Sequence, residues 1–298
     1  MDYPEIKDFI ELKYSQNSEG PARLFRSFES ILTAFEIQNT EVIKALDPFL
    51  EIHFYIERIQ ESSIIVWLLK KIMTPDYDEL LVKPEIGGDV SAYLKLEQES
   101  FIESIAGSQT SRIGNRVLDQ IEENAIEIAK STGVAKSANY APPNKLKVAE
   151  SIDIFARASQ ILLPDELYVF PTGSGTTGIG PFRSEIDVKQ LRIEMTKREV
   201  STKEKRVMMV KIADLLGKSK WRFKYLEKTI EARISDSVWL DKFHNKQDIV
   251  TPGDSLEAEV EQIDYFDKHN KLIDSEITIL EVYDVHEGRI EYSAKGKK

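Results

Sequence analysis

Three residues of this chain match the loose pattern of a metal-dependent nuclease. Asp165 follows a proline, and Asp187 and Lys189 form an acidic-x-lysine triplet further along. In that chemistry two carboxylates hold a divalent cation and a lysine orients the attacking water. An apolar strand usually leads into the triplet, whereas 181–185 is poor strand material, and such triplets are common in a charge-rich chain. Asp165, Asp187 and Lys189 are therefore catalytic candidates only for a second alternative function.

A locally basic stretch at 189–211 holds eight Lys or Arg against three Glu. Most such runs are solvated hairpin tips, and some contact phosphates. The candidate residues for nucleic-acid binding in this stretch are Lys197, Arg198, Lys203, Lys205 and Arg206.

The segment 220–225 interleaves basic residues with Trp221, Phe223 and Tyr225, a composition used for binding single strands. Alternate residues of a strand face opposite sides, so the aromatic rings would share one face and the cations the other. A closed barrel would bury the rings and expose the cations, which favours core packing for the aromatic residues.

Other motifs carry little chemistry. A G-x-G-x-x-G pattern at 173–178 is followed at once by Gly180-Pro181, which leaves no room for the helix of a dinucleotide site. Gly217-Lys218-Ser219 lacks the first glycine of a phosphate-binding loop and is better interpreted as a hairpin turn. The four histidines have no metal-site spacing, so we expect no metal site and no cofactor.

The composition of the chain excludes several kinds of functional site. The chain has 298 residues, a net charge of −11 and no cysteine, which excludes disulfides, iron–sulfur clusters, thiolate zinc sites and a cysteine nucleophile. The net charge argues against a surface that binds nucleic acid all over, although it permits a local basic patch. The longest apolar run, 64–69, is too short to span a membrane, and no signal peptide is recognisable. A cytoplasmic protein without membrane contact is expected.

The order of predicted elements indicates an α+β fold in several parts. Residues 1–88 predict an N-terminal α+β unit of strand, amphipathic helix and further strands, and 89–165 predict a helical region that includes a helix ended by Gly133. Six glycines or prolines predict a loop over 166–185. Residues 186–298 predict a β-rich C-terminal domain of three strands, a short helix capped by Asp236 or Ser237, and two strands. That order is typical of a β-barrel-like domain and is shared by the OB-type barrel.

Two segments together resemble a known group of proteins. One is Ile52 to Ser63, which leads into an apolar run, and the other comprises Trp221-Arg222-Phe223, Ala232 to Asp236, Trp239-Leu240 and Pro252 to Leu256. In these patterns the chain resembles uncharacterised bacterial proteins of mobile elements and phage-defence loci. The resemblance implies an accessory or sensing subunit, and it assigns no catalytic residue.

These observations favour a non-enzymatic recognition or scaffolding subunit over an enzyme. A protein partner or self-association is expected, and nucleic acid is a second partner class. The alternatives are a nucleic-acid-binding protein that uses the C-terminal barrel and the 189–211 stretch, and a metal-dependent nuclease.

Overall fold

The computed structural model describes residues 5–14, 21–48, 50–60, 64–73, 87–108, 113–137, 139–173, 175–213, 220–226 and 228–288. It is a mixed α+β protein with six α-helices and two sheets in these ranges. The chain divides into two compact units, Met1–Leu191 and Arg192–Lys298. Within the described ranges, no helix combines the length and the apolar character that crossing a membrane requires.

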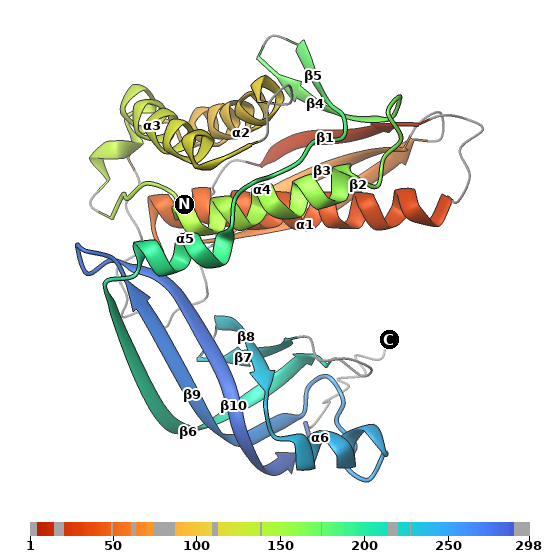
Figure 1. Cartoon of the computed structure of the whole chain (residues 1–298), viewed down its shortest axis with the longest axis vertical. Coiled ribbons are helices and arrows are strands. Elements are labelled where there is room, and N and C mark those ends of the chain that lie inside the picture. The colour runs from red at the N-terminus through yellow and green to blue at the C-terminus, as the bar shows by residue number, and fades with distance from the viewer. Residues whose placement is uncertain are drawn as a thin grey trace, which may run out of the picture. The chain divides into compact units, whose positions relative to one another are not determined.

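The first unit is built on a five-stranded antiparallel sheet with the order β2-β3-β1-β4-β5 (Figure 1). The strands are β1 (Ile6–Lys13), β2 (Glu51–Gln60), β3 (Ile64–Met73), β4 (Leu167–Thr172) and β5 (Gly175–Ile179). Even-numbered residues of β1 and β3, such as Leu12 and Leu68, are buried. One face of the sheet therefore belongs to the core, as the period of two requires.

Helices cover the buried face of this sheet. They are α1 (Pro21–Leu46), α2 (Val90–Gly107), α3 (Asn115–Thr132) and α4 (Lys145–Ser159), with a short 3-10 turn η1 (Val134–Lys136). Figure 1 shows α1 and α4 side by side along the sheet. The Phe35 ring stacks on Phe170 at 5.1 Å and meets the rings of Phe101 and Phe155 edge-on. These rings bring α1, α2, α4 and β4 into one core.

A buried ion pair fixes the start of α1 to the turn before β4. The Arg23 guanidinium donates two hydrogen bonds of 2.6 Å to the two carboxylate oxygens of Glu166, whose side chain is fully buried. The Glu166 carboxylate also accepts a 2.8 Å bond from the Leu163 backbone N–H. Such a bidentate pair stabilises only while both partners stay, because either charge alone would be buried without compensation.

The second unit contains a closed ring of strands in the order β10-β8-β7-β6-β9. The ring comprises β6 (Arg198–Ile212), β7 (Trp221–Tyr225), β8 (Lys228–Ile234), β9 (Ser255–Phe266) and β10 (Leu272–His286). Only the β8–β10 pairing in this ring is parallel. Helix α6 (Ser237–His244) joins β8 to β9, and the Asp236 side chain caps it by accepting the Trp239 N–H.

The expected element types are confirmed in most places, and the expected boundaries differ in one region. Instead of a loop, 166–185 contains β4 and β5, a hairpin that pairs with β1. Residues 1–88 and 89–165 therefore belong to one unit that extends to Leu191, because β4 returns to the sheet after the helices. Helix α5 (Val188–Met195) follows this hairpin. Pro171 is tolerated in β4 because it lies beyond the residues that pair with β1.

The buried acid Glu97 on α2 makes stability depend on pH. Its side chain is almost fully buried, the Oε1 atom has no hydrogen-bond partner, and burial raises the pKa to about 8. In the unfolded chain the pKa returns to its ordinary value near 4.5. The folded state therefore holds a proton that the unfolded state has lost between these two values, and stability present below pH 4.5 is lost as the pH rises to about 8.

We predict that Glu97→Gln becomes progressively more stable than the wild type between pH 5 and pH 9. The difference in unfolding free energy should grow by about 3–5 kcal/mol, since each pKa unit corresponds to about 1.4 kcal/mol. Urea denaturation at several pH values measures it. Glu103→Gln is the control, because Glu103 is exposed on the same helix. Parallel pH profiles for Glu97→Gln and the wild type would contradict the prediction.

Candidate functional site

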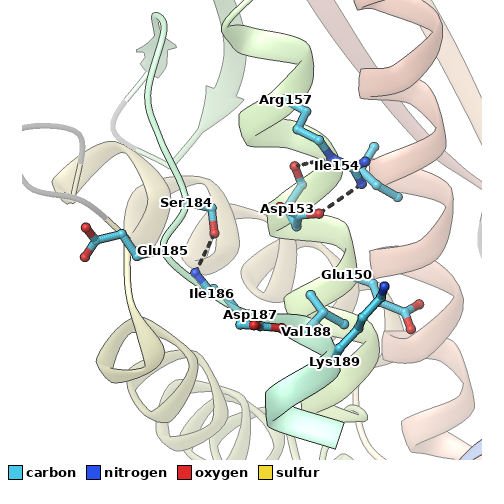
Figure 2. A pocket seen from close by; sticks show the side chains of 10 residues that line it. All are labelled: Glu150, Asp153, Ile154, Arg157, Ser184, Glu185, Ile186, Asp187, Val188 and Lys189. Carbon is cyan, nitrogen blue, oxygen red and sulfur yellow. Dashed lines mark hydrogen bonds and ion pairs between the residues drawn. The ribbon is translucent and has the colours of Figure 1, made fainter.

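The residues proposed for a nuclease lie partly together on the first unit. Asp187 and Lys189 line a groove of about 670 Å³ with Glu150, Asp153 and Arg157 of α4 (Figure 2). Asp165 is exposed in the turn after α4 and is not among the residues that line the groove. The structure therefore joins Asp187 to Lys189 but does not place Asp165 with them.

Local bonds already engage the acidic groups of this groove. The Asp187 carboxylate caps α5 by accepting the Gln190 backbone N–H at 3.0 Å. Figure 2 shows the second contact, in which Asp153 pairs with Arg157 at 2.9 Å. Across the described ranges, no three His, Asp or Glu side chains are grouped so that they could hold a metal ion. The groove's geometry thus gives the nuclease hypothesis no support.

The basic candidates of 189–211 lie mostly on strand β6, which forms a long ladder with β9 rather than a hairpin tip. Lys203 pairs with Glu261 at 3.7 Å, and Lys205 pairs with Glu257. The Arg198 guanidinium lies over the Phe266 ring at 4.3 Å. Acidic residues of β9 therefore balance the two lysines, and this part of the ring offers little net positive charge to a polyanion.

The Arg206 side chain is buried and is therefore not available on the surface. Its side chain is 7% exposed, and the guanidinium donates to Glu204 Oε1 and Gln262 Oε1, both at 2.6 Å. The same group lies 4.9 Å from the centre of the Tyr225 ring. Lys197, by contrast, is exposed before β6 and donates to the Glu194 carbonyl at 3.2 Å. Of the five candidates, Arg206 is thus the one that belongs to the core of the unit.

A different set of cations gathers on the outer face of β7 and β8. Along β7, Trp221 and Phe223 are buried inside the ring, while Arg222 between them is exposed. This confirms the expected separation of rings and cations. In the strand ladders, Arg222 lies between Ile212 of β6 and Glu231 of β8, and Lys224 lies between Met209 and Thr229. The cations of this basic face are Lys211, Lys220, Arg222, Lys224 and Arg233.

Among the described residues of the basic face, Glu231 is the acidic one, and it pairs with Arg222 at 3.3 Å. Lys211 of β6 donates to the Thr229 hydroxyl of β8 at 2.9 Å, so its side chain reaches across β7. Among the residues that the structure describes, this face holds five cations and one acid, and Lys224 has a further interaction partner. Sequence reasoning had Lys211 in the 189–211 stretch and the bases of 220–224 in a separate segment, and it missed Arg233. Alternation along each strand predicts which of these cations face outward, but only the pairing of the strands places them on one face.

Comparison with protein-family models, with curated proteins and with solved structures finds no match for this chain. The assignment of a function therefore depends on the geometry of these surfaces.

We predict that Arg206→Met destabilises the second unit by about 2 kcal/mol, because two hydrogen bonds to a charged donor and the Tyr225 contact are lost. Lys205→Met should cost less than about 1 kcal/mol, since Lys205 is an exposed ion-pair partner on the opposite face of the same strand. Chemical denaturation of both variants measures the two costs. Equal costs would contradict a structural position for Arg206.

Proposed function

We propose that the protein is a non-enzymatic cytoplasmic recognition subunit whose C-terminal ring binds single-stranded nucleic acid. The observation that carries the proposal is the excess of cations on the outer face of β7 and β8, defined above as the basic face. Within the same proposal, the resemblance to proteins of bacterial defence and mobile-element loci suggests the kind of system in which this subunit acts.

The ring's topology supports an OB-type barrel. Numbered from β6, the strands follow the order first, second, third, fifth, fourth around the ring, and a helix lies between the third and fourth. The third and fifth strands, β8 and β10, are parallel. OB-type barrels bind oligonucleotides on the face of their second and third strands, which correspond here to β7 and β8. The basic face thus coincides with the binding face of that barrel type.

Binding on this face would be electrostatic. Trp221 and Phe223 are inside the ring, so they offer no stacking surface to bases. The exposed apolar groups beside the face are Ile212 and Leu226. Lysine and arginine contacts to phosphates release counterions, and affinity then falls steeply with salt and depends little on base sequence.

The test compares two sets of substitutions in the full chain. We expect Lys211→Gln, Arg222→Gln, Lys224→Gln and Arg233→Gln together to weaken binding of a fluorescent single-stranded oligonucleotide by at least about tenfold. Since each phosphate contact on a single strand contributes about 0.7 to the slope of log affinity against log salt, the slope should fall by about 2–3. Fluorescence anisotropy at several salt concentrations measures both quantities.

The control is Lys203→Gln with Lys205→Gln, two exposed lysines of the same unit that β9 glutamates balance. This pair should leave affinity and salt slope nearly unchanged. Salt-independent binding, no binding by the wild type, or an equal loss in the control would each reject the basic face as the nucleic-acid interface.

A protein partner or self-association is also part of the proposal, and strand β2 supports it. β2 is an edge strand of the first sheet, and Tyr55, Ile56 and Ile59 on it are between 46% and 63% exposed. Exposed edges with apolar side chains pair with other strands unless charge or a covering element prevents it. A second copy of the chain or another protein could therefore extend this sheet.

We predict that Ile56→Lys with Ile59→Lys lowers the apparent mass of any complex that the wild type forms, because charged side chains on an edge oppose pairing. Sedimentation velocity over a range of protein concentrations measures this effect. Ile249→Lys is the control, since Ile249 is 75% exposed in the other unit. A complex of the same mass with the double variant would exclude β2 as the contact.

A further inference from the structure

The sheet of the first unit opens between β1 and β4. Residues Glu11–Lys13 of β1 pair with Leu167–Val169 of β4, and the ladder ends there. The preceding residues, from Ile6 to Ile10, pair only with β3, and Phe170 to Thr172 pair only with β5. A cavity of about 330 Å³ lies at this opening, lined by residues of β1, β3, β4, α1, α2 and β2.

A buried network of three side chains lies at the inner end of the opening. The Lys70 ammonium on β3 donates to Asp8 Oδ2 on β1 at 3.1 Å and also to Gln98 Oε1 on α2. The Gln98 amide in turn donates to Asp8 Oδ2. The side chains of Lys70 and Asp8 are only 3% and 9% exposed. An ammonium in such a place is costly unless charge and hydrogen bonds compensate it.

The same network also provides a hydrogen-bond acceptor for a backbone N–H at the opening. Asp8 Oδ1 accepts the Phe9 backbone N–H at 2.8 Å, on the part of β1 where β4 has moved away. The Asp8 carboxylate therefore binds a backbone N–H as well as the two side chains of the network. Pro171, which has no N–H, lines the opposite side of the cavity. Asp8 on β1 and Pro171 on β4 are therefore both compatible with an open sheet at this place.

The polar balance of the cavity favours a ligand that accepts hydrogen bonds. Both Asp8 oxygens and the Gln98 oxygen already accept bonds within the network, whereas the Lys70 ammonium has three N–H groups and two acceptors there. Of the charged lining residues, Lys95 pairs with Glu99 and Lys7 pairs with Glu57, which leaves Lys70 as the buried cation of the cavity.

Apolar walls complete the cavity. Phe9, Ile52, Leu94 and Pro171 contribute hydrocarbon surface to it. Its volume lies at the lower end of the range of small-molecule sites, which combine apolar walls with a few polar groups that orient the ligand. We propose that this cavity binds a small organic carboxylate, with its apolar body between β1 and β4 and its carboxylate toward Lys70. This site belongs to the first unit and does not depend on nucleic-acid binding by the second.

The test uses phenylacetate and isocaproate as probes, each with its primary amide as an uncharged match. Isothermal titration calorimetry with the full chain should show each acid binding at least about tenfold more tightly than its amide, because a hydrogen bond between an ammonium and a carboxylate is stronger than one to a neutral amide. No preference of either acid over its amide would overturn the proposal.

Substitutions then locate the preference. Lys70→Met combined with Asp8→Asn removes both buried charges, so no single charge is left uncompensated, and it should abolish the preference for the acid. Lys71→Met is the matched control, because Lys71 is the next residue of β3, pairs with Glu5, and is not among the residues that line the cavity. A preference that persists in the folded double variant would overturn the proposal.

Hydrogen exchange on the wild-type protein tests the site without any substitution. Phenylacetate should slow exchange of the strand amides at 6–10 and at Phe170 and Thr172, which flank the cavity, and leave the strands of the second unit unchanged. Slowing confined to other segments would contradict the assigned position, even if the double variant failed to fold.

Discussion

The pairing of β1 with β4 is the constraint on which the first unit depends. Strands β2 and β3 follow β1 closely in the chain, but β4 arrives only after three further helices. Bringing such distant segments together costs loop-closure entropy, which the buried contacts must offset. The Arg23–Glu166 ion pair and the stack of Phe35 on Phe170 join the same two regions. These contacts stabilise the unit by joining its N-terminal segments to a segment that lies far along the chain.

The shortness of that pairing has a second effect. Because β1 and β4 share only three paired positions, their remaining residues separate and leave the cavity beside Lys70. A longer ladder would close the opening and leave no place for Pro171 between two partners. Asp8 is central to this arrangement, since it compensates the buried ammonium and accepts the Phe9 N–H at once. The polar groups at the open part of the sheet thus bind one another within one small region.

In the second unit, the closed ring separates charge by face. The β6–β9 ladder pairs lysines with glutamates, whereas the described residues on the outer face of β7 and β8 include more cations than acids. A net charge of −11 is therefore compatible with a local basic surface. The strand pattern of 221–225 was sufficient to predict which side chains face inward, because alternation is a local property. It could not show that Arg233 and Lys211 join Arg222, because that depends on which strands are neighbours.

The sequence by itself determined most elements: the strand and helix types, the helix end at Gly133, a cap at Asp236 or Ser237, and the succession of three strands, a helix and two strands in the C-terminal domain. These features follow from hydrophobic period, capping chemistry and backbone preference, which act over a few residues. Only the tertiary structure decided that 167–179 is a hairpin of the first sheet, that Arg206 is buried, and that Lys70 meets Asp8 and Gln98. Each of these facts depends on contacts between segments far apart in the chain, whose register no local pattern specifies.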